Sequence, residues 1–582
     1  MKAMSKKCQI ALVIALSAYV LKNLLVGADR DEGYGIVLAY RLAMGDRLLA
    51  EMWEPHQTSA VFTSLFIRPF LWFTGGVEFL DIYLRIVYFL IHGVVTYFVY
   101  STFRTCIFHG EKQNALWLAL VFFAVSPKCI YIPEYSNLHI WFFTLLCLSI
   151  LWYSSAESPL NGRRWLLGVA GLALVCDVLA YPSMLILFPL FLIYIWKNAN
   201  KKIDSLIFTA PCLIGMVLFF GYILSYMTVD KIVQVIPYIL SDGSHRVGFA
   251  QKILFWLSNF GEIALVLLFA GMGAAVLTLV YCRLKRKTKG KTAYFLVFFF
   301  LALTAYQFYC WFTSEYKASY PLVIYDFILL GGIYCYQRDK MISLRDKITS
   351  LGNKNISHDD ESNKACLYLI YVSIVGYFGV LLLSNWKPIL LMPYLIVGVL
   401  GGLNCLSSYL SKRVEAWKGK VLPVLCAILV FGNVFGYCWL YIGGEWDHNS
   451  ILTLGGINRT GVYKGILTSY MSAYRYNTNE EDWKEAVPAN STCLYIGRDQ
   501  YYYMFSDCRI AAASTISTPE YDENLLAYWE LNPDRYPDVV VVECWFGDMR
   551  VAEEGSFIRQ WLENEYPASH VADYSYIKVY YK

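Results

Sequence analysis

The sequence predicts a mostly α-helical, polytopic membrane protein that ends in a small α/β domain. Of its 582 residues, 57% are hydrophobic and 16% are charged, whereas soluble globular proteins carry about 25% charged residues. Long apolar stretches recur from near the N-terminus to about residue 442, where the composition becomes mixed, charged and rich in tyrosine. We therefore expect a transmembrane helical bundle over residues 1–442 and an α/β domain over residues 443–582.

About thirteen segments are apolar enough to be candidate membrane spans, since a spanning helix needs ~20 such residues. The first follows Lys6 and Lys7 and lacks a small-residue cleavage site, so we expect an uncleaved membrane helix rather than a signal peptide. The candidates lie approximately at residues 8–27, 83–103, 115–132, 137–153, 165–179, 181–196, 203–226, 260–282, 292–312, 321–336, 366–384, 389–410 and 421–442.

Basic residues cluster in alternate loops between these segments, and loops rich in Lys and Arg face the cytoplasm. One topology satisfies every cluster, with a cytoplasmic N-terminus and an extracytoplasmic C-terminal domain. We expect a multi-pass protein of a plasma membrane, and the absence of eukaryotic targeting signals points to a bacterium. With a net charge of +4 and its basic residues placed between spans, the chain shows no nucleic-acid-binding surface.

The first outer loop, residues 28–81, contains two stretches that we expect to lie on the membrane surface as interfacial helices. The stretch 59–73 is short for a span and contains Arg68 and Pro69. A span there would also invert every later loop, whereas an amphipathic surface helix would not. The stretch 36–44 is the second such candidate.

The C-terminal part shows short β-branched runs beside helical patterns, which is typical of a small α/β domain. We predict strands at 492–496 and 539–542, helices at 522–530 and 555–565, and an edge strand at 574–581. Cys493 and Cys508 are candidates for a disulfide, and two free thiols are an equal alternative.

Asp31 and Glu32 follow directly on the first apolar segment. Carboxylates there are hydrated enough to ionise and close enough to the bilayer to meet a lipid-linked substrate. A carboxylate in a partly desolvated cleft can act as a general base, because desolvation raises its pKa. The plainer interpretation is that interfacial loops carry charge in order to stay hydrated.

The wider pattern of this loop resembles the GT-C superfamily of membrane glycosyltransferases, with lipid A aminoarabinose transferases and protein O-mannosyltransferases as the nearest families. The resemblance covers roughly residues 8–200, and it rests on the order of the surface helices and spans as well as on short motifs. The matching motifs are Asp31-Glu32, Ala39-Tyr40-Arg41, Gly45-Asp46, Pro55 and Tyr83-Leu84-Arg85.

The resemblance implies that Asp31 is the catalytic base of an inverting transfer and that Glu32 is a supporting carboxylate. Where these families have a Lys-Pro-Pro turn, this chain has Glu54-Pro55-His56-Gln57. The lysine that would meet a lipid phosphate is absent. Either His56 and Gln57 take its place in substrate binding, or the phosphate is held elsewhere.

Further candidates come from the other outer loops. Where the families place an aspartate before the fourth span, this chain has Glu134 and Asn137, so Glu134 is a candidate second acid. Glu134 and Asp31 could also hold a divalent cation, although a cation wants more oxygen ligands than these. The candidate phosphate ligands near the outer face are Arg85, His245, Arg246 and Lys317. For each of them, a polar side chain that simply reaches the membrane interface is an alternative explanation.

The leading hypothesis is a glycosyltransferase that moves a sugar from a polyprenyl-phosphate donor to a cell-envelope glycan, lipid or protein. No nucleotide-sugar site is visible, and no cofactor is certain beyond the possible cation. A transporter or flippase is one alternative, but it predicts internal repeats and ionisable residues near the membrane midplane. A polysaccharide polymerase is the other, and it predicts basic catalytic residues in later loops.

Overall fold

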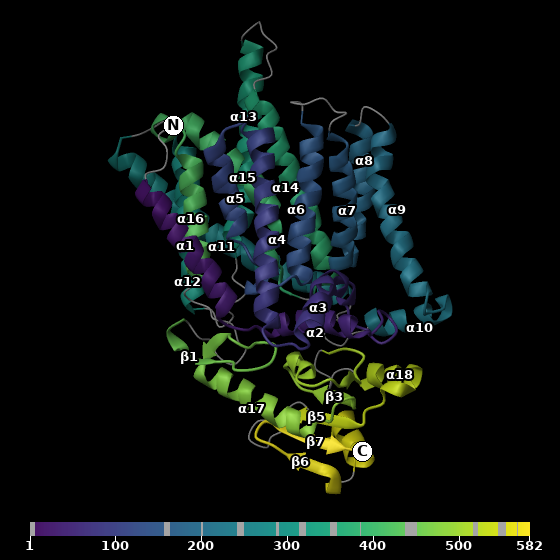
Figure 1. The fold of residues 1–582 in the computed structure, drawn as a ribbon. Helices are drawn as coiled ribbons and strands as arrows, with labels where there is room; N and C mark the ends of the chain where they lie inside the picture. The colour runs from purple at the N-terminus through teal and green to yellow at the C-terminus, as the bar shows by residue number, and fades with distance from the viewer. Residues whose placement is uncertain are drawn as a thin grey trace.

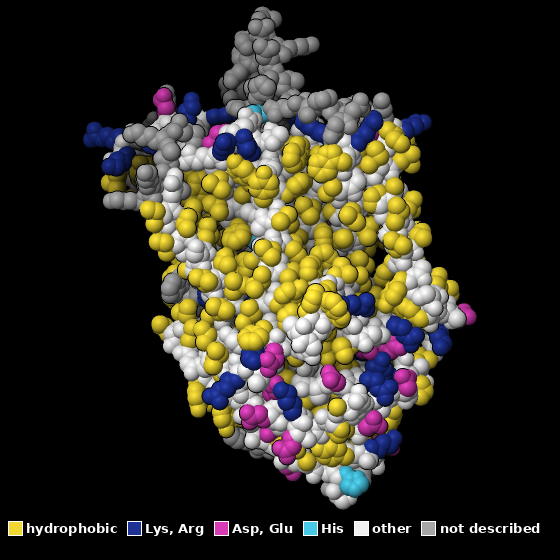
Figure 2. Space-filling model, viewed as in Figure 1, with side chains coloured by type: hydrophobic (Ala, Val, Ile, Leu, Met, Phe, Trp, Pro, Cys, Tyr) yellow, Lys and Arg dark blue, Asp and Glu magenta, His cyan; other side chains and the backbone are white. Residues whose placement is uncertain are grey.

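The structure is a computed structural model in which long helices run side by side and the C-terminal region, residues 451–582, lies at one end of them (Figure 1). Figure 2 shows a broad apolar surface around the helices, with Lys and Arg side chains at the opposite end of the bundle. The residues described are 6–155, 163–198, 202–240, 249–286, 290–313, 322–349, 358–384, 386–436, 451–515, 522–544, 555–566 and 568–582.

Every predicted span overlaps a helix, although the span predicted at 115–132 extends beyond α5, which ends at Phe123. Seven helical segments are long and apolar enough to cross a membrane, and four shorter apolar helices accompany them, within the described residues. The bundle helices are α1 (Lys6–Leu25), α4 (Leu80–Thr102), α5 (Lys112–Phe123), α6 (Tyr135–Ser154), α7 (Trp165–Ala180), α8 (Leu187–Asn198), α9 (Lys202–Leu224), α11 (Phe249–Leu284), α12 (Lys291–Thr313), α13 (Val323–Thr349), α14 (His358–Leu383), α15 (Ile396–Arg413) and α16 (Val421–Phe435).

Short helical turns join or extend several of these helices. The longest, η7, precedes α15, and together they form one apolar segment, of whose most apolar 18 residues 94% are buried inside the protein. These turns are η1 (Gln57–Ser59), η2 (Phe103–Ile107), η3 (Pro127–Cys129), η5 (Pro182–Ile186), η7 (Pro388–Leu395) and η8 (Glu415–Trp417).

The two predicted surface helices form at the end of the bundle next to the C-terminal region. They are α2 (Arg30–Met44) and α3 (Ala60–Thr74), and α10 (Val229–Leu240) lies at the same end (Figure 1). Trp72 and Phe73 at the end of α3 are more than three-quarters exposed. Aromatic side chains in that position suit the headgroup layer of a bilayer.

The C-terminal region is built on a five-stranded sheet of order β4-β3-β5-β7-β6, with a separate β1-β2 hairpin. β3 pairs in parallel with β4 and β5, and β7 is antiparallel to β5 and β6. The elements are β1 (Leu454–Ile457), β2 (Leu467–Ser469), α17 (Tyr470–Ala486), β3 (Thr492–Ile496), η11 (Gln500–Met504), β4 (Arg509–Ile510), α18 (Asp522–Leu531), η12 (Pro533–Arg535), β5 (Val539–Glu543), α19 (Phe557–Glu565), β6 (Val571–Asp573) and β7 (Ile577–Tyr581).

The strands predicted at 492–496 and 539–542 and both helices are present. The predicted edge strand at 574–581 is wrong in its position, because β7 lies between β5 and β6. The three-residue β6 is too short to be recognised from sequence, and it takes the edge instead. Cys493 and Cys508 are free thiols in the structure. The boundary expected near residue 443 lies outside the described residues.

Backbone hydrogen bonds join the C-terminal region to the first loop at three points. The amide of Gly27 donates to Leu467, that of Asp81 to Val462, and that of Trp53 to Ala513, at 2.8, 3.1 and 2.9 Å. The C-terminal region is therefore fixed against the α1–α2 link, the start of α4 and the turn after α2.

Candidate active site

The first turn of α2 carries the two acids that the sequence pattern singled out. Asp29 caps the helix, because its side chain accepts the amide of Asp31 at 2.9 Å while Glu32 returns to the amide of Asp29. Carboxylates in a first turn are stabilised by the positive end of the helix dipole. Asp31 is half-buried, whereas Glu32 is 2% exposed. Neighbours in sequence thus differ sharply in their access to solvent.

Glu32 lies in a buried cluster around Arg85. Nε and Nη2 of Arg85 donate to the two Glu32 oxygens at 3.1 and 2.6 Å, and Nε also lies 2.9 Å from Asp81 Oδ2. Nη1 donates to the carbonyl of Asn23 at the end of α1. Arg85, which is 2% exposed, therefore ties α1, α2 and α4 together, and its role as a phosphate ligand stays a prediction. Glu32 is its counter-ion.

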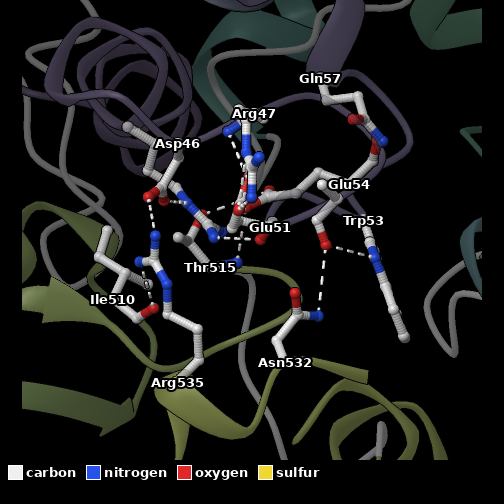
Figure 3. Close-up of polar contacts among 12 residues, drawn as sticks. Asp46, Arg47, Glu51, Trp53, Glu54, Gln57, Ile510, Thr515, Asn532 and Arg535 are labelled. Carbon is white, nitrogen blue, oxygen red and sulfur yellow. Dashed lines mark hydrogen bonds and ion pairs between the residues drawn. The ribbon is translucent and has the colours of Figure 1, made fainter. Parts of the chain in front are cut away.

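A second buried cluster lies at the other end of α2, around Arg41. Its Nε donates to Asp46 at 2.8 Å, and its Nη1 donates to Glu54 at 3.0 Å. Two residues of the C-terminal region complete the cluster (Figure 3). Arg535 donates to the second oxygen of Asp46 at 2.8 Å, and the Thr515 amide donates to Glu54 at 2.9 Å. Two carboxylates of the first loop are thereby committed to holding the C-terminal region.

Glu54 is fully buried in this cluster. Burial raises the pKa of Glu54 above its ordinary value, and the neighbouring Arg41 and the Thr515 amide oppose that rise. Glu51 is also occupied, by Arg47 at i,i+4 spacing. Glu51 and Glu54 therefore both stabilise the local fold of the first loop.

His56 and Gln57 form the polar turn that leads into α3. Gln57 is buried, and its side chain accepts the Leu49 amide at 2.7 Å and donates to the Glu54 carbonyl at 3.0 Å. His56 is half-buried and stacks on Tyr135 with ring centroids 3.9 Å apart. The structure thus gives Gln57 a role in the turn, while His56 keeps a partly open position.

Glu134 and Asn137 begin α6. Glu134 caps the helix by accepting the amides of Ser136 and Asn137, both at 3.0 Å. The Asn137 amide group donates to the carbonyls of Ile130 and Ile132 at 3.0 and 2.8 Å, which shapes the preceding loop. Both side chains are at most 2% exposed. They therefore define the start of a helix rather than present an acid to a substrate.

The second loop is nevertheless close to the first turns of α2. A Cβ atom placed on Gly35 would lie 2.9 Å from the Glu134 side chain. Gly35 is one turn beyond Asp31, on the same face of the helix. The absence of a side chain at residue 35 thus lets the loop pack directly against the Asp31 face.

The sequence reasoning missed a buried pair between α6 and α7. His139 Nδ1 lies 2.7 Å from Asp177 Oδ1, and both side chains are at most 1% exposed. His139 Nε2 and Asp177 Oδ2 have no hydrogen-bond partner among the described residues. Asp177 is the one acidic residue within α7, and an ionisable residue inside an apolar segment was a signal that could have found it.

The predicted divalent cation finds no ready ligand set in the described part of the chain, where no three His, Cys, Asp or Glu side chains cluster. Three predicted phosphate ligands, His245, Arg246 and Lys317, lie outside the described residues. These roles stay predictions.

No protein-family model and no curated protein matches the chain. Among solved structures it is similar to ArnT from Cupriavidus metallidurans bound to undecaprenyl phosphate, at 11% identity and a TM-score of 0.39, covering 99% of this chain and 98% of that one. It is also similar to the oligosaccharyltransferase AglB from Archaeoglobus fulgidus in complex with an inhibitory peptide and a dolichol-phosphate, at 10% identity and a TM-score of 0.41, covering 93% and 70%. Both are GT-C glycosyltransferases. Because identities and TM-scores are low, the activity of this chain has to be derived from its own residues.

Proposed function

We propose that this protein is a membrane glycosyltransferase with Asp31 as its general base. It takes a sugar from a polyprenyl-phosphate donor and transfers it to a cell-envelope acceptor on the membrane face where the C-terminal region lies. That face is the outer one if the Lys-rich loops at the opposite end of the bundle are cytoplasmic. The donor class follows from the sequence resemblance and from the place of Asp31 at the end of the first predicted span.

The observation that carries the proposal is the different burial of the acids in the first loop. Glu32 is clamped by Arg85, and Asp46 and Glu54 are held by Arg41. Asp31 is half-buried at the start of a surface helix. This is the environment that a base needs, because it must meet a substrate and still be shielded enough to accept a proton.

The transfer is a single displacement. The acceptor oxygen or nitrogen forms a bond to the anomeric carbon while the bond from that carbon to the donor phosphate oxygen breaks. The acceptor proton passes to Asp31, and the electron pair of the broken bond leaves with the polyprenyl phosphate. The leaving phosphate needs a cationic or hydrogen-bonding partner, for which His56, His245, Arg246 and Lys317 are the candidates.

The experiment is sugar transfer from a panel of polyprenyl-phosphate sugars in membranes that contain the wild type or Asp31→Asn. The variant keeps the shape of the side chain and removes the base, so turnover is expected to fall by about 10²–10⁴-fold. Asp29→Asn is the matched control. It removes a charge two residues away, yet asparagine still caps a helix, so its turnover should stay within a few-fold of the wild type.

Unchanged turnover in Asp31→Asn, with the protein folded and the donor bound, would remove Asp31 from the chemistry. An equal loss in both variants would show that the charge of the helix start matters rather than one base. Donor consumption without acceptor would indicate hydrolysis and would still require the carboxylate.

A transporter is the second candidate, and the buried His139–Asp177 pair favours it. Ionisable residues within membrane helices often mark ion pathways. A transporter predicts that Asp177→Asn abolishes proton-coupled uptake into vesicles while Asp31→Asn does not. The glycosyltransferase predicts the reverse ranking in the transfer assay.

A further inference from the structure

Large apolar side chains are exposed on the β1–β2 hairpin and on the first turns of α17. They lie outside the helical bundle, and each of them is between 39% and 89% exposed. Single exposed apolar residues are normal on a protein surface, whereas several together mark a surface for interaction. The members of this hairpin patch are Leu452, Ile457, Leu467, Tyr470, Met471 and Tyr474.

The hairpin patch is continuous from the strands to the helix. Ile457 pairs with Leu467 across the two antiparallel strands, so their side chains are neighbours on one face. A Cβ atom placed on Gly455, an exposed position of β1, would lie 3.6 Å from the Tyr470 side chain. Tyr470 and Tyr474 stack one turn apart on α17, with ring centroids 6.3 Å apart. The hairpin and the helix therefore present one apolar surface.

The hairpin lies where two predicted spans end. The Gly27 amide, directly after α1, donates to the Leu467 carbonyl at 2.8 Å. Lys464, in the turn of the hairpin, pairs at 2.7 Å with Glu78, two residues before α4. Both contacts join the hairpin to the level at which apolar helices of the bundle end. The headgroup layer of a bilayer lies at that level.

The opposite face of the hairpin is covered by α17. A Cβ atom placed on Gly456 would overlap the side chain of Ala473 in that helix. Figure 1 shows the hairpin between α17 and the end of the bundle. On α1, which ends beside the hairpin, Leu21 and Leu25 are exposed too. Apolar surface thus runs from a predicted span onto the hairpin face that α17 leaves uncovered.

The chemistry of the hairpin patch suits the interface of a bilayer. It contains no charged side chain, and two of its six members are tyrosines. Tyrosine is enriched where membrane meets water, because its ring is apolar and its hydroxyl is polar. Leucine, isoleucine and methionine beside it favour contact with the boundary between headgroups and acyl chains.

We propose that the hairpin patch is a membrane-docking surface that rests in the headgroup layer of the bilayer which the bundle spans. Its partner is the lipid surface itself. The C-terminal region is then held in two ways, by ion pairs with the first loop around Arg41 and by contact of the hairpin with lipid. The inference is independent of the proposed function, because a transporter with this fold would carry the same surface.

The test is photocrosslinking of the full-length protein in proteoliposomes of phosphatidylethanolamine and phosphatidylglycerol. p-Benzoylphenylalanine replaces Tyr470 in one variant and Tyr474 in another, so an exposed aromatic ring is kept at each position. After irradiation, intact-protein mass spectrometry distinguishes a lipid adduct from a covalent protein dimer. Lipid adducts are expected in both variants.

His570→p-benzoylphenylalanine is the matched control. His570 is exposed and immediately precedes β6, which lies on the side of the C-terminal region farthest from the bundle (Figure 1). Its yield of lipid adduct should be several-fold lower than that of the two hairpin-patch variants. A yield at residue 570 equal to theirs, or no lipid adduct at either tyrosine position, would overturn the inference. Protein dimers in place of lipid adducts would assign the hairpin patch to a second copy of the chain instead.

Discussion

The two ends of α2 face the same C-terminal region in opposite ways. At the C-terminal end, Arg41, Asp46 and Glu54 form a closed cluster that Arg535 and Thr515 complete across the junction. At the N-terminal end, the start of α2 lines a cavity that residues of the C-terminal region also line, and Asp31 is half-buried.

This comparison shows how one short helix can hold the C-terminal region at one end and carry the proposed base at the other. Buried ions are held tightly when every partner is present, and breaking such a pair costs several kcal/mol. The ion pairs at the C-terminal end hold α2 in place. The N-terminal end can therefore carry a half-buried carboxylate near a cavity while the helix stays ordered. The underside of that open end is secured separately by Glu32 and Arg85.

The largest expected effect comes from removing the anchor. Arg41→Met would leave Asp46 and Glu54 without their shared cation, and we expect a loss of about 3–5 kcal/mol of stability. Thermal unfolding in detergent, followed by the recovery of monodisperse protein, measures it. Arg559→Met is the control, because Arg559 pairs with the largely exposed Glu563 on the surface of α19, where such pairs contribute about 1 kcal/mol or less. Equal losses in the two variants would break the comparison.

The next effect separates the two adjacent acids of the open end. Glu32→Gln removes a charged partner of buried Arg85, so we expect a loss of about 2–3 kcal/mol. Asp31→Asn changes a half-buried side chain in the first turn, where a carboxylate is worth about 1 kcal/mol or less to the helix, so we expect the smaller loss there. Denaturation of both variants under one condition ranks them. A greater loss in Asp31→Asn would show that Asp31 is a structural group and not a base.

The smallest effect concerns pH. Burial raises the pKa of Glu54 above its ordinary value of 4.5, so the folded state retains this proton when the unfolded chain releases it. Its contribution to stability is therefore fully present below pH 4.5 and is lost as pH rises through the folded pKa. The unfolding temperature of the wild type, relative to Glu54→Gln, should fall as pH increases from 4.5. A wild-type advantage that instead grows with pH would reverse the sign of this assignment.

The helices and their order could be predicted because they follow from local composition. Apolar runs lie over every bundle helix. The argument from Arg68 and Pro69 set α3 apart from the spans, and α3 lies at the end of the bundle beside the C-terminal region (Figure 1). Asp81 and Arg85 lie at i,i+4 spacing in α4, and Arg85 Nε is 2.9 Å from Asp81 Oδ2. Such features depend on residues within one helix, where geometry is set by the sequence itself.

The roles of the site residues were harder to predict from the sequence, because they depend on partners far along the chain. Glu54 finds Thr515 across 461 residues, and Asp46 finds Arg535 across 489. No local pattern reports such a pairing. The contact of Arg85 with Glu32 was missed for the same reason, since the two lie 53 residues apart. The role of Glu134 was easier to predict, because an acid directly before an apolar run can be recognised as a helix cap.

That long separation has a consequence for synthesis. Asp46 emerges from the ribosome 489 residues before Arg535, which at about 5–20 residues per second is roughly half a minute to a minute and a half. Throughout that interval Asp46 and Glu54 can pair with Arg41 but not with Arg535 and Thr515, which have not yet been synthesised. A chain that stops before residue 515 would therefore lack both side-chain contacts that hold the C-terminal region to this cluster.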